Sequence, residues 1–406
     1  MSTDGLRGKR VLLTGGRAPA ALEMARLLAA AGCEVIAAES TRHHLCRVSR
    51  SVKRSCRVPS PAADPAAFAD ALEEIIAQEG IHSLIPTCEE LFFVAASRER
   101  LGSQCAVFTA PLAQLQRLHS KAEFIRTAGR LGFNVPMTVR ISKPEEWRDF
   151  AHSSSFRDML SSGGCVLKPE YSRFAAKVRI ATSRQELVEA ASELGTGHYP
   201  WVAQQYIGGR EICTYSIVHD GKVTAHAAYA SELSAYGGAS VYFEPLRHPA
   251  AQAWAARFAE LERFTGQLAF DLIEQEDGSL MPIECNPRTT SGIHLLAGNP
   301  GIAEALLLPQ ASSASAPVEP RPDKRVMLAL PMLAAGLSGR LRGKPGRHWL
   351  PRWLGAGDAT FRWSDPRPAL EQLLLARELQ RTARRRGLSL IEAATCDIEW
   401  NGRELV

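Results

Sequence analysis

The sequence predicts a mixed α/β fold in which a parallel-sheet domain precedes a domain that contains an antiparallel hairpin. Residues 10–40 read as strand, glycine turn, helix and strand, an alternation typical of a parallel sheet with crossover helices. Residues 268–288, LAFDLIEQEDGSLMPIECNPR, contain Asp277-Gly278, the strongest short signal for a hairpin turn. A length of 406 residues allows roughly two to four domains with ample core.

The composition is that of an ordinary globular protein, with 45% apolar and 22% charged residues. A formal charge of +5 is small for this length. Basic runs at residues 47–57 and 377–386 lack the interleaved aromatic residues of single-strand nucleic-acid binders, so no nucleic-acid partner is expected. Nine scattered cysteines without a Cys-x-x-Cys pair predict neither a zinc site nor a disulfide framework. No apolar run reaches transmembrane length, and a cytoplasmic location is expected.

The parallel sheet begins with a strand at residues 11–14, a turn at Gly15-Gly16, a helix at 20–31 and a strand at 34–38. A helix at 65–79 leads into a strand at 83–86 and then a polar loop. Ligands of open parallel sheets lie beyond the carboxyl ends of the strands. The loop residues Thr87, Glu89 and Glu90 are therefore candidate substrate residues. The glycine turn lacks the G-x-G-x-x-G fingerprint, which disfavours nicotinamide binding.

The chain changes character after about residue 111. A helix at 119–131 carries Lys121, and a short strand at 165–169 carries Lys168 inside an apolar run. Strands are expected at 135–140, 202–207, 211–218 and 222–230, and a helix at 250–264. Residues 309–324 are rich in Pro, Ser and Ala and read as a linker or surface excursion. An amphipathic helix is expected near 368–386.

The hairpin predicts that two carboxylates lie opposite each other. With a two-residue turn at Asp277-Gly278, Ile273 pairs with Pro282 and Asp271 pairs with Glu284, while Glu276 faces Ser279. Asn286 points to the same face as Glu284. The opposite face is expected to enter the core through Leu268, Phe270, Leu272, Met281, Ile283 and Cys285.

Like charges placed directly opposite each other are destabilising, so the carboxylate pair calls for a cation. Two carboxylates and an amide oxygen are hard ligands suited to Mg²⁺, which commonly joins carboxylates to substrate phosphates. The alternative is a solvated acidic face on an ordinary hairpin.

The order of these elements resembles the ATP-grasp superfamily over residues 10–300. The matching pieces are SKAEF with Lys121, VLKP with Lys168, the hinge strand VAQQYIGGRE, and FDLIEQEDGSLMPIECNPR. A Walker A motif is absent, so a phosphate site must use another architecture. The resemblance implies an α+β ATP-grasp fold with four parts: a Rossmann-like domain at residues 1–115, a two-subdomain ATP-grasp core at 116–309, a linker at 310–324 and a C-terminal extension at 325–406.

The resemblance also implies roles for particular residues. Lys121 and Lys168 would contact ATP phosphates, and Arg288 and Lys168 would be the catalytic residues beside the transferred phosphate. Glu211 would hold the ribose. The adenine would be lined by Gln204, Gln205, Tyr206 and Ile207, and the Mg²⁺ (or Mn²⁺) ligands would be Asp271, Glu284 and Asn286.

Three departures from the family pattern bear on these roles. The hinge has Gln204-Gln205 where two acidic residues are common, which affects only the side-chain contact to the adenine amino group. The loop after Lys168, EYSRFAAK at 170–177, lacks the glycines that are frequent there in the family. Ser172 and backbone amides are still expected to contact phosphate, with Arg173 or Lys177 as a source of charge. Ala269 occupies a position that holds arginine in the D-alanine ligase branch, which disfavours that branch. The ending ECNPR resembles the carbamoyl phosphate synthase and biotin carboxylase side.

The resemblance implies an ATP-dependent ligase that activates a small carboxylate, with an amino acid as one candidate, as an acyl phosphate and couples it to an amine. Alternatives are a bicarbonate-activating enzyme and a non-catalytic ATP-binding module. A homodimer is left open. Candidate substrate residues lie in the segment 231–245, as a mobile loop or an ordinary connection, and just past the hairpin: Tyr236, Gly238, Ser240, Thr290, Ser291 and His294, the last weighed as a general base or a structural hydrogen-bonder.

Overall fold

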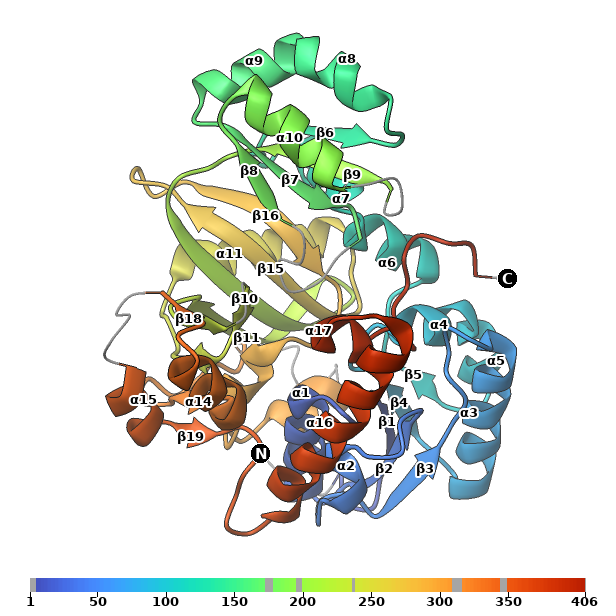
Figure 1. Ribbon diagram of the computed structural model, residues 1–406. Helices are drawn as coiled ribbons and strands as arrows, with labels where there is room; N and C mark the ends of the chain where they lie inside the picture. Colours follow the sequence, from blue (N-terminus) through green and yellow to red (C-terminus); the bar gives the residue numbers. More distant parts are fainter. Residues whose placement is uncertain are drawn as a thin grey trace.

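The structure, a computed structural model, describes residues 5–171, 178–194, 199–235, 238–308, 316–343 and 349–405 (Figure 1). It is a mixed α/β protein, as predicted. Its first sheet is parallel, with the strand order β3-β2-β1-β4-β5. The elements of this layer are β1 (Arg10–Thr14), α1 (Pro19–Ala30), β2 (Glu34–Glu39), α2 (Leu45–Val48), β3 (Arg54–Arg57), α3 (Pro65–Glu79), β4 (Ser83–Ile85), α4 (Leu91–Ala96), α5 (Arg98–Gly102) and β5 (Ala106–Val107).

The loops after β1 and β4 meet where the strand order reverses, the usual ligand position in such sheets. The Thr87 hydroxyl donates to the carbonyl of Thr14, and the Thr14 hydroxyl donates to Glu90. Gly15 lies between them with φ of +74°, and a Cβ there would meet Thr87 Oγ1 at 2.5 Å. Only glycine therefore lets the two loops approach this closely.

A second sheet, with the order β6-β9-β7-β8, forms an upper subdomain within residues 138–205 (Figure 1). Helices α8 to α10 cover its outer face, and their apolar side chains form a separate core around Phe156 and Trp201. The elements are β6 (Thr138–Ile141), α8 (Glu146–His152), α9 (Ser154–Ser161), β7 (Cys165–Pro169), β8 (Arg179–Ala181), α10 (Arg184–Leu194) and β9 (Trp201–Gln205).

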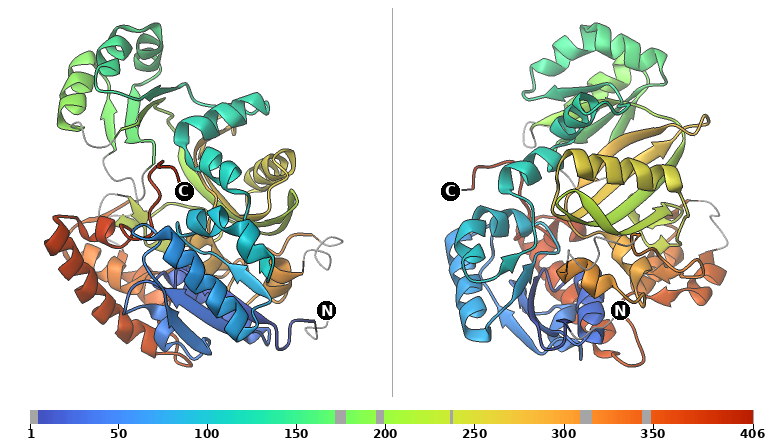
Figure 2. Two further views of the ribbon diagram at one scale, coloured as in Figure 1. Left: turned by 90° about the vertical axis from the view of Figure 1, so that its right-hand side faces the viewer. Right: turned by 180° about the vertical axis from the view of Figure 1, so that it is seen from behind.

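A third, antiparallel sheet with the order β11-β10-β15-β16 lies between the other two. Helices α7 and α11 cover one face of this central sheet (Figure 2). There Phe124 stacks on Phe270, and Phe258 meets both rings edge-on. Its elements and their neighbours are α6 (Leu112–His119), α7 (Lys121–Arg130), β10 (Arg210–His219), β11 (Lys222–Ala230), α11 (Pro249–Leu261), β15 (Gly266–Glu274), β16 (Leu280–Asn286), η2 (Ser291–Leu296) and α12 (Ile302–Leu307).

The helix predicted at 119–131 begins later, because Ser120 is its N-cap. The Ser120 hydroxyl accepts from the backbone N–H of Glu123, and the preceding helix α6 ends at His119. Lys121 is consequently the first residue of α7.

The β15–β16 hairpin confirms the pairing of Asp271 with Glu284 but corrects the turn. Gln275 and Ser279 close a three-residue loop, in which Gly278 has φ of +81°. The inner pairs are therefore one residue out of the predicted register, and Leu272, not Ile273, faces Pro282. A bulge between Asp271 and Leu272 then restores the predicted register.

The bulge also changes which side chains of β16 enter the core. Pro282 and Leu280 are buried with Leu272, whereas Met281 and Ile283, predicted as core residues, are only half-buried. Met281 pairs with Ile273 on the face that carries Asp271.

The C-terminal region packs on the parallel-sheet layer and on the central sheet (Figure 1). Asp365 accepts from Ser49 and from Arg26, and both Asp365 and Arg26 are buried. The elements of this region are β17 (Val326–Met327), α14 (Ala329–Leu337), β18 (Leu341–Arg342), α15 (Trp349–Gly355), β19 (Gly357–Asp358), α16 (Arg367–Arg386) and α17 (Leu390–Ala393). Its strands form two small sheets with the earlier strands β12 (Ser234–Ala235), β13 (Ala239–Ser240) and β14 (Tyr242–Phe243).

Part of the predicted linker is ordered against the central sheet. Val318 forms a parallel bridge with Ala225 on β11, exchanging backbone hydrogen bonds with Thr224 and His226. Residues 309–315 lie outside the described residues.

Candidate active site

Two buried lysines from different parts of the fold converge on β16. Lys121, from α7, places its Nζ 3.5 Å from Glu284 Oε1. Lys168, from β7 of the upper sheet, donates to Ile283 O at 3.0 Å and to Gln204 Oε1 at 2.9 Å. The structure therefore brings together the two lysines and the carboxylate that the sequence singled out, from segments more than 40 residues apart.

Burial and neighbouring charges shift the pKa values of this cluster in different directions. Burial lowers the pKa of Lys168 to about 8, against the attraction of Glu284. Burial opposes ionisation of Glu284, but Lys121 and Lys168 lower its pKa overall. Burial, together with the charges of Glu284 and Glu211, raises the pKa of Asp271 to about 7. Three carboxylates, those of Glu211, Asp271 and Glu284, thus influence one another, and the two lysines lie nearest to Glu284.

The donor set on the hairpin fits a hard divalent cation. Asp271 and Glu284 are paired in register, and Asn286 Nδ2 lies 3.5 Å from Asp271 Oδ2. Arg288 donates to Asn286 Oδ1 at 2.9 Å, which leaves the amide nitrogen toward Asp271, so the amide must turn over for Oδ1 to join Asp271 as a cation ligand. Two carboxylates and an amide oxygen on adjacent strands are the chemistry that Mg²⁺ prefers.

A second group of potential ligand atoms shares only Asp271 with that set. Single atoms of Glu211, Cys213 and Asp271 all lie within 4.8 Å of one another. Burial raises the pKa of the Cys213 thiol well above its usual range, so the thiol is protonated and a poor ligand for a hard cation. The predicted set with Glu284 and Asn286 offers oxygen donors only, which fit a hard cation better than a set that contains a thiol.

The side chains of the predicted hinge residues Gln204 and Gln205 point in opposite directions. Gln204 is buried and links Lys168 to Thr138, because its Nε2 donates to Thr138 Oγ1 at 3.1 Å. The Gln205 side chain turns the other way and accepts from the backbone N–H of Met137. Beyond the strand, Tyr206 is exposed and Ile207 is half-buried.

Glu211 is near the start of β10, opposite Ile273. Burial, with a contribution from Glu284, raises the pKa of its carboxyl. Ile273 pairs with Met281, so a half-buried apolar surface adjoins these carboxylates on the same sheet face.

Glu89 joins the parallel-sheet layer to this cluster. Its Oε1 lies 3.8 Å from Arg288 Nε and 4.0 Å from His119 Nε2, and Glu89 is fully buried. His119 was missed in the sequence because a lone histidine before a helix carries no pattern. Thr87 and Glu90 are also buried and hydrogen-bonded to Thr14, which gives them a structural role in the loop.

The remaining predicted substrate residues are less closely associated with the lysines. His294 is buried with its Nδ1 3.3 Å from Glu23 Oε2, as expected of a structural hydrogen-bonder. The Ser240 and Ser231 hydroxyls are 2.6 Å apart, and Gly238 donates to the Ala235 carbonyl. Thr290 and Ser291 are half-buried, and Ser172 and Tyr236 lie outside the described residues.

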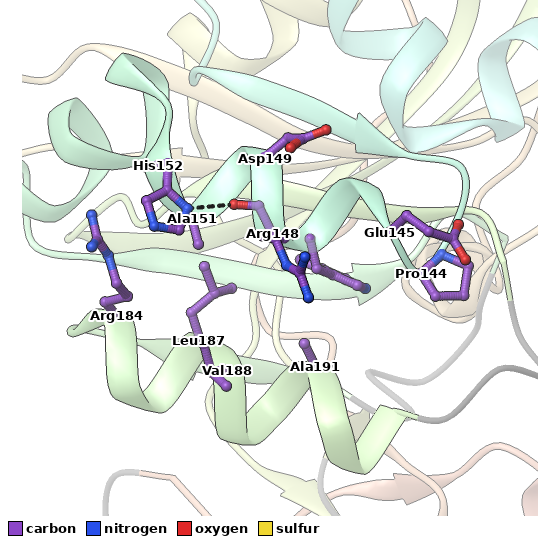
Figure 3. A pocket seen from close by; sticks show the side chains of 11 residues that line it. Pro144, Glu145, Arg148, Asp149, Ala151, His152, Arg184, Leu187, Val188 and Ala191 are labelled. Carbon is purple, nitrogen blue, oxygen red and sulfur yellow. Dashed lines mark hydrogen bonds between the residues drawn. The ribbon is translucent and has the colours of Figure 1, made fainter.

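A hollow of about 640 Å³ lies on the outer side of the upper subdomain, between α8 and α10 (Figure 3). Its lining includes Trp147, Arg148, Arg184 and Leu187 and none of the residues predicted for the site. It is separate from the lysine cluster.

Comparisons with known proteins find similarity in structure alone. No protein-family model and no curated protein sequence matches the chain. L-amino acid ligase from Bacillus licheniformis matches with a TM-score of 0.57 and 18% identity over 79% of each chain. Phosphoribosylamine–glycine ligase from Thermotoga maritima matches with a TM-score of 0.57 and 17% identity, over 77% of this chain and 78% of that one.

A third match is the biotin carboxylase domain of 2-oxoglutarate carboxylase from Hydrogenobacter thermophilus, solved with magnesium ADP and bicarbonate. Its TM-score is 0.57 and its identity 14%, over 75% of this chain and 70% of that one. The chain has the fold of the ATP-grasp superfamily, which confirms the resemblance inferred from the motifs.

Proposed function

We propose that this protein is an ATP-dependent ligase that activates a small carboxylic acid as an acyl phosphate and couples it to an amine. The observation that carries the proposal is the convergence of two lysines on β16, Lys121 at the Glu284 carboxylate and Lys168 at the adjacent Ile283 carbonyl, with Asp271 opposite Glu284. Phosphoryl transfer depends chiefly on positioning and on stabilising negative charge. This cluster supplies two buried lysines beside the site proposed for Mg²⁺.

The proposed nucleotide position follows from the surfaces around the lysines. The adenine would lie between the 204–207 segment and the half-buried pair Ile273 and Met281, with the ribose hydroxyls at Glu211. The phosphates would then reach Lys168 and Lys121. Asp271, Glu284 and Asn286 would hold a Mg²⁺, which would supply positive charge against the negative charge that develops during transfer.

The acid is proposed to bind beside Arg288, on the side where Glu89 approaches from the parallel-sheet layer. A carboxylate oxygen attacks the γ-phosphorus, the bond to the β-phosphate oxygen breaks, and ADP leaves. An amine then attacks the acyl carbon, phosphate leaves with the electron pair of the broken bond, and the amine loses a proton. Arg288 stabilises charge on the transferred group, and Lys168 fixes the phosphate chain.

Amino acids are the substrate class we propose first, because an L-amino acid ligase is among the solved structures that share this fold. Bicarbonate is the competing substrate, since the matching carboxylase domain was solved with that anion. The two substrates predict different requirements for ATP turnover.

The test is an ADP-release screen over amino acids and other small acids with a panel of amines, with mass analysis of the products. We expect ADP and phosphate release that requires both an acid and an amine, and a product whose mass is their sum less one water. AMP and pyrophosphate as products would contradict the acyl-phosphate route. ATP turnover that needs only bicarbonate would show that bicarbonate, and not an organic acid, is the activated substrate.

Glu284→Gln is the inactive variant in this screen, because it removes one carboxylate of the cation site. Glu274→Gln is its matched control, since Glu274 lies on the same hairpin and bonds to His248 outside the lysine cluster. Unchanged turnover in Glu284→Gln would refute the cation site. Nucleotide binding without turnover across the whole panel would favour a non-catalytic module.

A further inference from the structure

The C-terminal region concentrates positive charge. Residues 329–386 contain twelve Lys and Arg against four Asp and Glu, a formal charge of +8, whereas the whole chain carries +5. The rest of the chain is therefore slightly acidic. Such an asymmetry points to attraction toward an anionic surface and not to a requirement of the fold.

The same region also concentrates exposed apolar side chains. Among the described residues, nine of the fourteen large apolar side chains that are exposed lie between residues 330 and 390. Trp363 is 90% exposed and Leu370 is 68% exposed. Single exposed leucines are ordinary, but a concentration of this kind marks an interaction surface.

Helix α16 combines the two features on one face. Its inward face packs through Glu371, Leu375 and Ala383, which are buried. The outward face carries three exposed leucines toward its N-terminal end and exposed arginines toward its C-terminal end. We call this the α16 face: Trp363, Leu370, Leu373, Leu374, Arg377, Arg381, Arg384 and Arg385. The helix lies at the front of the molecule in Figure 1 and along its outer edge in the left view of Figure 2.

The acidic residues of α16 do not compensate these arginines, because both turn inward. Glu371 is buried and accepts from Arg47 and contacts His43. Glu378 accepts from the backbone N–H groups of Arg42 and His43. The outward face of this fully described helix therefore presents leucine and arginine together.

We infer that the α16 face docks on an anionic lipid bilayer surface. A helix with leucines and arginines on its outward face, preceded by an exposed tryptophan, has the chemistry of an interfacial helix. A second copy of the chain is a poorer occupant, since a twofold contact would bring together two copies of the same positively charged face. The inference stands apart from the proposed ligase activity, because none of these residues belongs to the lysine cluster.

The test is sedimentation of the full chain with phosphatidylcholine vesicles, made with and without phosphatidylglycerol. We expect binding only to the anionic vesicles, and weaker binding at high salt. Replacing Arg377, Arg381, Arg384 and Arg385 by Gln should weaken binding by about fivefold per arginine. A second variant, Trp363→Gln with Leu370→Gln and Leu374→Gln, should also weaken it, since burial of apolar side chains contributes to the affinity.

The charge-matched control replaces four exposed arginines of the upper subdomain by Gln: Arg148, Arg157, Arg179 and Arg184. It should bind as the unaltered chain does, and both α16 variants should keep the far-ultraviolet circular dichroism of that chain. The inference is overturned by absence of binding to either vesicle, by equal loss in the control, or by equal binding to neutral vesicles. Self-association that the leucine variant abolishes, without vesicle binding, would assign the surface to a second copy and also overturn it.

Discussion

Lys168 and Ile283 are joined by a hydrogen bond between the upper sheet and the central sheet, with Lys168 Nζ 3.0 Å from Ile283 O. Ile283 lies at the bulge of the β15–β16 hairpin, where a strand leaves backbone groups outside the ladder. The bulge therefore does two things. It sets Asp271 opposite Glu284, and it supplies an acceptor for the lysine that comes from the other sheet.

Gln204→Leu should weaken use of ATP, because Gln204 is one of the two acceptors that hold Lys168. Hydrogen bonds to charged groups contribute about 1.5 to 3 kcal/mol, so kcat/KM for ATP should fall roughly ten- to a hundredfold. Gln205→Leu is the control, because that side chain accepts from Met137 instead. Equal losses in the two variants would show that the hinge strand and not the lysine contact is responsible.

Gly209→Ala should disturb the start of β10, where the predicted ribose residue Glu211 lies. Gly209 has φ of +151°, and a Cβ there would meet Glu274 O at 2.3 Å. We expect a loss of about 2 kcal/mol or more in the free energy of unfolding and a raised Kd for ATP. Gly208→Ala has open space around its Cβ and should stay within about 0.5 kcal/mol. Urea unfolding and nucleotide titration measure both, and a benign Gly209→Ala would contradict the geometry.

Acid should destabilise the protein partly through Glu39. Burial opposes ionisation of Glu39, but the guanidinium of Arg17 lowers its pKa to about 2, from an ordinary value of 4.5. Because the folded pKa is depressed, the stabilisation is fully present above pH 4.5 and is lost as the pH falls toward 2. The shift corresponds to about 3 kcal/mol.

Urea unfolding between pH 7 and pH 3 checks this contribution. Glu39→Gln should be less stable than the unaltered chain at pH 7 and should lose less further stability on acidification. Glu34→Gln is the control, since its partners Arg10 and Lys53 are exposed. Parallel pH profiles for Glu39→Gln and the unaltered chain would contradict the assignment.

Trp400→Ala should lower the free energy of unfolding, because Trp400 packs between the parallel-sheet layer and Tyr171. The Trp400 ring is 4% exposed, stacks on Phe92 at 4.9 Å between centroids, and meets the edge of Tyr171 at 5.1 Å. Truncating a buried tryptophan costs about 3 to 5 kcal/mol. Trp363→Ala removes a tryptophan that is 90% exposed and should leave Tm nearly unchanged. Calorimetry distinguishes the two, and similar Tm values for both variants would contradict this packing.

The sequence predicted the hairpin pairing well, although for a partly wrong reason. A two-residue turn was expected, but the loop has three residues and the bulge corrects the register. Turn length and bulge depend on contacts such as the one from Lys168, more than 100 residues away. The exchange of Met281 and Ile283 for Leu280 and Pro282 in the core follows from the same bulge.

The sequence predicted the candidate-site residues that lie within recognisable motifs. It did not predict the residues that support them. Lys121, Lys168 and Glu284 have recognisable surroundings in the sequence. His119 and Glu170 do not, yet Glu170 accepts from Ser120 and from Arg140. Such partners are set by tertiary packing between distant segments, and no local pattern marks them. The contacts of the C-terminal region with Arg17 and Arg26 were invisible for the same reason.

The contacts of Asp397 and Trp400 have a consequence for synthesis of the chain. Asp397 binds Arg17, which follows the first strand, and Trp400 covers Phe92 of the parallel-sheet layer. A ribosome makes residues near 17 well before residues near 400, so the parallel-sheet layer emerges before the segment that covers it. During translation the apolar surface under Trp400 therefore stays uncovered until this later segment has been made.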